Sequence, residues 1–274
     1  MHGGGAGEFR AVFPGKAMIG MIHLPALPGA PRNTLSIDEL IGYALSETAK
    51  LERAGLDGVI VENVADTPFF KERLPAVTVA AMAAIAREVV GHTKMKVGLN
   101  LLRNACAEAL SVAHVCGARF IRCNILIGAY AADQGIIEGC AAELLRLRRE
   151  LGAQVLILGD VHVKHAHPIF DVPIEDAASD LAERGGADAV IVSGARSPVP
   201  PSRERLKRVR EAIDLPVLVG SGVGLATVQE FYQDADGLIL GEPDFKLGGV
   251  WGGPSDEAAY AEAVRRCRGL EAGL

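Results

Sequence analysis

The sequence has few cysteines, few aromatic residues and no excess of basic residues. Its five cysteines (Cys106, Cys116, Cys123, Cys140 and Cys267) are odd in number and contain no C-x-x-C pair. This usage matches neither a disulfide framework nor a zinc knuckle, so we expect free, buried thiols. Aromatic residues make up 5% of the chain, and the composition is otherwise that of an ordinary globular protein with a tilt toward Ala, Gly and Val.

Positive charge is also scarce. The 274 residues include 28 Lys+Arg and 34 Asp+Glu, for a formal net charge of −6. Nucleic-acid binding needs an excess of basic residues on one face. The most basic run, residues 203–210, is interrupted by Glu204, Leu206 and Val209 at helical spacing, which is typical of a solvated helix face. We therefore expect no nucleic-acid partner.

Long apolar runs are missing as well. The most apolar stretch, 76–86, is closed by Arg87 and Glu88 and is shorter than the roughly 20 residues that span a bilayer. The glycine-rich start lacks the apolar region of a secretion signal. We expect a cytoplasmic protein without membrane insertion.

What is present is a regular alternation of short Val/Ile-rich runs with longer amphipathic stretches. The runs lack polar alternation, as expected for parallel strands buried on both faces. Strands are predicted near 17–22, 58–62, 95–99, 119–123, 154–159, 188–192, 216–219 and 237–240. Helices are predicted near 36–54, 77–91, 104–116, 138–151, 175–184, 202–213, 225–233 and 256–268.

Eight strand–helix pairs without a proline- or serine-rich linker indicate a single α/β domain, a (β/α)₈ TIM barrel, over residues 16–270. Residues 1–15 are expected to be a flexible N-terminal segment.

Chemistry in this fold is expected at the carboxyl ends of the strands, where eight loops converge. Candidate catalytic residues there are His23, Glu62, Asp160, His162 and Lys164. If the last three alternate along one strand, they share a face. An acid, an imidazole and an amine at one mouth suit proton transfer, a divalent metal or a Schiff base. His23 is equally interpretable as a hydrogen-bonded histidine.

Further polar residues at the strand ends are candidate substrate-binding groups: Asn63, Asn100, Arg122, Asn124 and Ser193. The asparagines suit sugar hydroxyls or caps of the loop backbone. Arg122 suits an anionic substrate or an ion pair with Glu62.

Small residues follow the last two strands: Gly220, Ser221, Gly222 and Gly241. This is where the fold usually cradles a phosphate on backbone N–H groups, although glycines also serve tight turns. A dinucleotide fingerprint is disfavoured, because only one strand follows.

Several motifs together resemble the BtpA/SgcQ family. They are Ile19–Gly29, Val61–Asn63, Gly98–Asn104, Phe120–Asn124, Asp160–His165 and Gly220–Val223. The resemblance covers about residues 17–250 and implies a barrel of the ribulose-phosphate-binding type. It carries no catalytic assignment, since the family links a cyanobacterial photosystem I factor with SgcQ-like proteins of carbohydrate metabolism. This chain departs from the family pattern at Ala105, over 195–201 and over 224–227.

Two functions follow as hypotheses. The first is an enzyme that enolises a phosphorylated sugar or sugar-like metabolite, as an epimerase, isomerase or aldolase-type lyase. The second is a non-catalytic assembly factor that acts through a protein partner. A divalent metal and a homo-oligomer are compatible with either.

Overall fold

The computed structural model describes residues 5–194 and 199–271. Within these residues eight parallel strands close a barrel, with the first strand paired to the last. The barrel strands are β1 (Ala17–His23), β2 (Gly58–Glu62), β3 (Lys96–Asn100), β4 (Phe120–Cys123), β7 (Leu156–Val161), β9 (Ala189–Val192), β10 (Val217–Val219) and β11 (Gly237–Leu240). The predicted TIM barrel is confirmed.

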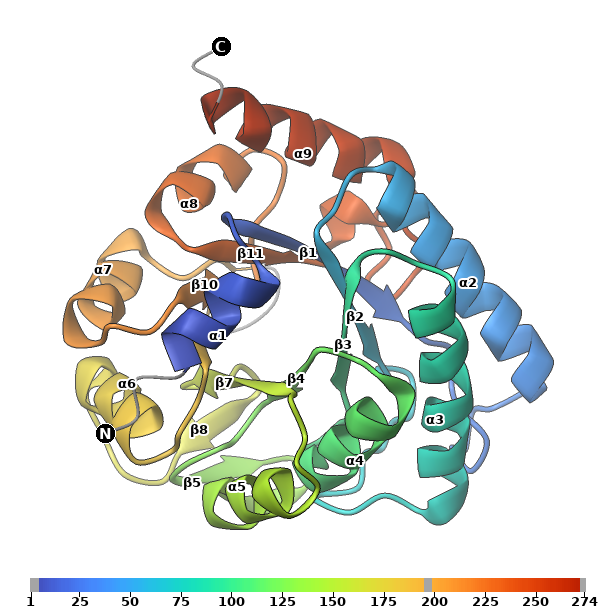
Figure 1. Ribbon diagram of the computed structural model, residues 1–274, viewed down its shortest axis with the longest axis horizontal. Coiled ribbons are helices and arrows are strands. Elements are labelled where there is room, and N and C mark those ends of the chain that lie inside the picture. Colours follow the sequence, from blue (N-terminus) through green and yellow to red (C-terminus); the bar gives the residue numbers. More distant parts are fainter. Residues whose placement is uncertain (1–4, 195–198, 272–274) are drawn as a thin grey trace.

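Helices surround this barrel, as Figure 1 shows. They are α2 (Ile37–Arg53), α3 (Ala76–Gly91), α4 (Cys106–Cys116), α5 (Ala141–Glu150), α6 (Ile174–Glu183), α7 (Arg203–Ala212), α8 (Val228–Asp234) and α9 (Glu257–Glu271). Two short 3₁₀ helices, η1 (Pro243–Phe245) and η2 (Leu247–Gly249), follow β11. Local sequence explains some boundaries: α2 begins at a capping box in which Ser36 and Glu39 satisfy each other's backbone N–H groups.

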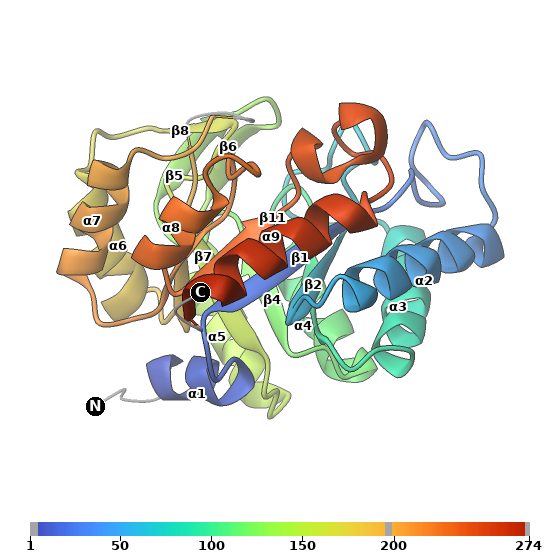
Figure 2. The same cartoon turned by 90° about the horizontal axis from the view of Figure 1, so that it is seen from above.

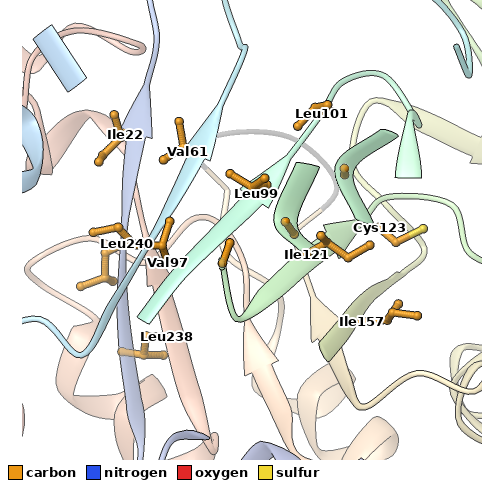
Figure 3. Close-up of a cluster of buried hydrophobic side chains, with 14 of the residues drawn as sticks. Ile22, Val61, Val97, Leu99, Leu101, Ile121, Cys123, Ile157, Leu238 and Leu240 are labelled. Carbon is orange, nitrogen blue, oxygen red and sulfur yellow. The ribbon is translucent and has the colours of Figure 1, made fainter. Parts of the chain in front are cut away.

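Two hydrophobic layers follow from the alternation of each strand. Outward side chains pack against the helices; Ile22, Val61, Leu99 and Leu240 are among those drawn in Figure 3. Inward side chains such as Ile60, Leu158 and Ile239 fill the barrel interior. Both layers are almost fully buried, which is why the strands lack polar alternation.

The N-terminal end of the barrel is closed by helix α1 (Gly5–Val12), which crosses it in Figure 1. Phe9 and Phe13 are each 2% exposed, and the Phe13 ring lies 5.8 Å from that of Phe120 inside the barrel. Gly98 makes room for Phe120, because a Cβ at residue 98 would lie 2.1 Å from its ring. The expectation of a flexible segment over 1–15 is thus corrected over residues 5–13, where buried phenylalanines fix the chain; residues 1–4 lie outside the described part.

A small antiparallel sheet at the opposite end was not predicted. It comprises β5 (Ala129–Ala132), β6 (Gly135–Glu138) and β8 (Ala166–Pro168), in the order β6–β5–β8. Figure 2 shows it and α1 at opposite ends of the barrel. Its strands have four residues or fewer, too few for a periodic pattern to stand out.

Candidate active site at the carboxyl end of the barrel

Each barrel strand ends near, or is directly followed by, an inward polar or small residue. Each of these residues lies two residues beyond an inward residue of the barrel interior, as strand alternation requires. In the order of the strands along the chain these residues are His23, Glu62, Asn100, Arg122, Asp160, Ser193, Gly220 and Gly241. The apolar barrel interior therefore ends in a polar layer at the mouth.

Above this layer lies a pocket of about 670 Å³. Residues predicted for the site that line it are His23, Glu62, Asn100, Arg122, Asn124, Lys164, Gly220 and Gly241. His167 of β8 and residues from the loops complete much of the wall; the loop residues include Arg103, His165, Glu242 and Trp251. The pocket thus gathers side chains from distant parts of the chain around one volume.

Glu62 is held by two neighbours. One carboxylate oxygen accepts a hydrogen bond from Asn100 Nδ2, and the other lies 3.8 Å from Nε2 of His23. Burial and the charges of Lys246 and Lys164 hold the pKa of His23 well below its ordinary value. The imidazole is therefore neutral at neutral pH, and its Nδ1 is buried without a hydrogen-bond partner in the described residues.

Asp160 and Arg122 form a buried ion pair beneath the pocket. Nε and an Nη atom of Arg122 donate to the two carboxylate oxygens at 2.9 Å each, and Asn124 Nδ2 donates at 2.8 Å. Asp160 does not line the pocket. Asp160 was predicted to be a catalytic base. Its three accepted hydrogen bonds instead favour a role in positioning Arg122. The expected alternative, an Arg122–Glu62 pair, is replaced by this one.

Asp160, His162 and Lys164 do not share a face, contrary to prediction. Strand β7 ends at Val161, and His162 adopts a left-handed backbone with φ 49°. This turn sends His162 to a second cavity beside Tyr130, while Lys164 reaches the central pocket. Burial, followed by the charge of Arg122, lowers the pKa of Lys164.

Asn63 ties loops together instead of lining the pocket. Its Nδ2 donates to Asp66 at 2.9 Å, and its Oδ1 accepts from the backbone of Leu102 at 2.8 Å. Asp66 in turn accepts from the backbone N–H of Leu27. These hydrogen bonds join the loops after β1, β2 and β3. Asn63 therefore caps the loop backbone, which is one of the two roles predicted for the asparagines.

The glycine-rich turns after β10 and β11 differ most from the prediction. The Gly222 N–H donates to Glu242 at 2.8 Å, and the Leu225 N–H donates to Asp244 at 3.0 Å. Gly222 has φ 77° and is crowded by Pro200. A carboxylate of the chain itself thus occupies one of the N–H groups expected to cradle a phosphate, that of Gly222, and the charges of Glu242 and Asp244 oppose a second anion there.

Other orphaned polar atoms gather near the mouth. Besides His23 Nδ1, the buried atoms Asn124 Oδ1, Ser193 Oγ, Ser221 Oγ and Glu242 Oε2 have no partner among the described residues. Ser193 and Ser221 do not line the pocket. Native structures seldom leave buried polar atoms unsatisfied, so this cluster is typical of a place that takes ligand or water.

Sequence reasoning missed Arg103, Glu242 and Trp251. The guanidinium of Arg103 lies in the pocket wall and donates to the Lys164 carbonyl at 2.7 Å. The Trp251 ring lies 5.6 Å from that of His23. Arg103 stands in a motif already singled out, and Glu242 lies two residues after the end of β11, so both had a positional signal. Trp251, eleven residues beyond the strand, had none.

Four of the candidate catalytic residues carry possible metal ligands, but they do not come together as a metal site: His23, Glu62, Asp160 and His162. Asp160 is bound to Arg122, and His162 faces another cavity. Among the described residues, the grouping whose ligand atoms are close enough for one ion is formed by cysteines outside the mouth.

No helix in the described ranges is both long and apolar enough to cross a membrane.

Fold and site together define a TIM-barrel protein with a polar pocket at the carboxyl end of its strands. Solved barrels are similar to it. Tryptophan synthase from M. tuberculosis matches with a TM-score of 0.60 and 17% identity, covering 96% of this chain and 98% of that one. N-(5′-phosphoribosyl)anthranilate isomerase from Pyrococcus furiosus matches with a TM-score of 0.55 and 17% identity, covering 92% and 98%. At such identities the likeness concerns the fold.

Sequence comparison is more specific. The BtpA family model matches residues 14–267, and the chain belongs to the BtpA family. The photosystem I biogenesis protein BtpA of Synechocystis is 42% identical, over 81% of this chain and 78% of its own. An uncharacterised protein of Methanocaldococcus jannaschii is 43% identical, over 84% and 87%.

Proposed function

We propose that this chain is an enzyme that binds a small anionic, sugar-like metabolite and moves a proton at a carbon beside a carbonyl. The reaction class is that of an epimerase, an isomerase or an aldolase-type lyase. The observation that carries the proposal is the meeting of Glu62, neutral His23 and Lys164 in one pocket at the barrel mouth.

Glu62 is the proposed base. Its hydrogen bond from Asn100 fixes the carboxylate, and its second oxygen remains beside His23 in the pocket wall. A positioned carboxylate of this kind takes a proton from carbon most efficiently when the negative charge left on the carbonyl oxygen is stabilised. Neutral His23 suits proton transfer to that oxygen.

Lys164 is proposed to stabilise the enolate or to form an imine with the substrate. Its lowered pKa favours either a hydrogen bond to the developing enolate or attack of the neutral amine on the carbonyl, with loss of water to give an imine. Arg103, which binds the Lys164 backbone, adds a positive charge to the same wall. The substrate's anionic group, a phosphate in our proposal, therefore belongs beside Arg103 and Lys164.

Exchange of substrate protons with solvent tests the reaction class without knowledge of the product. The protein is incubated in D₂O with a panel of sugar phosphates, and loss of the C–H signal beside the carbonyl is followed by NMR. We expect exchange for at least one member, abolished in Glu62→Gln and retained in the surface control Glu211→Gln. Exchange that persists in Glu62→Gln would remove Glu62 as the base.

The imine branch has its own test. Borohydride added during turnover should leave a mass adduct on Lys164 if the imine forms. Turnover without an adduct rules out the imine. Unchanged turnover in Lys164→Met rules out any catalytic role of Lys164.

A second candidate function is assembly through a protein partner. It is supported by the name of the Synechocystis relative and by apolar side chains exposed around the mouth, including Phe70 at 56% and Phe170 at 73%. The chain would be expressed in Synechocystis cells lacking their own BtpA, with photosystem I content as the readout. Rescue by Glu62→Gln but not by Phe170→Ser would favour assembly over catalysis.

A further inference from the structure

Three cysteines from separate elements meet on the outer side of the barrel wall. Cys106 is the first residue of α4, Cys123 is the last of β4, and Cys140 precedes α5. The Cys123 sulfur lies 2.6 Å from that of Cys106 and 3.6 Å from that of Cys140. All three sulfur atoms lie within 4.8 Å of one another.

The cluster is separate from the proposed active site. Cys123 follows Arg122 directly and points to the opposite side of β4, into the outer apolar layer drawn in Figure 3. The cysteine cluster therefore lies on the opposite face of β4 from the pocket, and metal binding there can be measured separately from the proposed catalysis.

The three sulfurs lie in the outer apolar layer, with amide oxygens as their nearest polar neighbours. Among the described residues, no histidine or carboxylate joins the three thiols within ligand distance of one ion. The nearest oxygens are amide acceptors: Asn104 Oδ1 lies 3.4 Å from the Cys106 sulfur, and the Ile125 carbonyl lies 3.6 Å from that of Cys140. A sulfur-only donor set selects soft cations over hard ones.

The number of donors narrows the choice of ion. Structural Zn²⁺ sites take four protein ligands, whereas Cu(I) is a soft ion that three thiolates can satisfy. Metal–sulfur bonds of about 2.3 Å, as in zinc thiolates, place the corners of a planar three-sulfur site about 4 Å apart. The Cys123–Cys140 spacing fits this with little change, while the Cys106–Cys123 contact must open.

We propose that Cys106, Cys123 and Cys140 form a three-coordinate thiolate site for Cu(I). Binding releases the thiol protons and needs no change in oxidation state. Cys106 and Cys123 are buried, but Cys140 is only partly so. Its neighbours Gly139 and Ala141 line the second cavity, which gives the ion an approach from solvent.

The test is titration of the fully reduced full-length protein with Cu(I) under anaerobic conditions, in competition with bicinchoninate. One Cu(I) per chain is expected. Cys140→Ser, at the least buried position, should weaken binding by about 100-fold or more, since even residues behind metal ligands contribute 10–100-fold. X-ray absorption should show three sulfur neighbours.

Cys116→Ser is the matched control. Cys116 is a buried thiol of the same helix, α4, but contacts the Ala83 carbonyl rather than the cluster. This variant should bind Cu(I) like the parent. Thermal unfolding of each metal-free variant separates loss of the site from loss of the fold.

Three outcomes overturn the proposal. One is a reduced protein that fails to bind Cu(I), and another is binding that survives Cys140→Ser. The third is tighter binding of Zn²⁺ with a fourth ligand from water. If purification without reductant yields a disulfide, restored Cu(I) binding after reduction supports the site, and absent binding assigns the cluster to disulfide formation instead.

Discussion

Asp160→Asn is expected to destabilise the fold strongly, because it removes the counter-ion of a buried guanidinium. The Arg122 and Asp160 side chains are 5% and 0% exposed, and two hydrogen bonds of 2.9 Å join them. Breaking such a pair from one side costs about 3–5 kcal/mol. Glu62 and Glu242 also act on Arg122, so we expect the lower end, about 3 kcal/mol.

For a chain of this size that loss corresponds to a fall in Tm of roughly 6 °C. Urea unfolding followed by circular dichroism measures it directly. The double variant Arg122→Met/Asp160→Leu removes both charges and should recover to within about 1 kcal/mol of the parent, since apolar replacement of a buried pair is often neutral.

Two results would refute this reasoning. If Asp160→Asn loses less than about 1 kcal/mol, then the pair contributes little to holding Arg122. If the double variant is as unstable as Asp160→Asn, the loss arises from packing and not from an uncompensated charge.

The remaining predictions concern the barrel ends and interior. Phe9→Ala should cost about 3–5 kcal/mol of unfolding free energy, by emptying a buried site at the barrel floor; a loss under about 1 kcal/mol in urea would mean that α1 is dispensable. Gly98→Ala should cost about 1–3 kcal/mol or more by overpacking Phe120, and Gly98→Ala/Phe120→Leu should recover part of the loss in the same assay. Burial lowers the pKa of Lys246 to about 8 from 10.5. The unfolded chain keeps the Lys246 proton up to a higher pH than the folded protein does. The unfolding free energy should therefore increase by about 3 kcal/mol between about pH 8 and 10.5. Lys246→Met should abolish this increase, as measured by urea unfolding across that pH range.

Much of the fold could be predicted because parallel strands buried on both faces leave a strong pattern. The strand predicted at 58–62 coincides with β2, and that at 237–240 with β11. Helix α1 and strand β5 could not be predicted in this way. The first owes its order to Phe9 and Phe13 meeting Phe120 far along the chain, and the second is a short strand of a loop sheet.

The site was predicted where alternation along a strand decides direction. His23, Glu62 and Arg122 follow that rule and line the pocket. The rule failed at His162, because a left-handed residue ends the alternation after β7. It also could not show which groups are already occupied, as Gly222 is by Glu242, since such partners depend on contacts between distant loops.

The three clustered cysteines also depend on contacts between distant parts of the chain, which the sequence does not show. Spacing rules for metal sites recognise ligands that are close in sequence. Cys106, Cys123 and Cys140 are each separated by 17 residues, one on a helix, one on a strand and one in a loop. Only the packing of α4 against both β4 and α5 brings them together.

The closure of the barrel has a consequence for the order of events during synthesis. The ribosome makes α1 and β1 first, but α1 packs on β7 and β9, and β1 pairs with β11 near the other end of the chain. Phe9 and Phe13 therefore leave the ribosome long before their apolar partners exist. The nascent chain must carry an exposed aromatic pair and an unpaired edge strand through most of translation, which makes this stage the natural point of chaperone dependence.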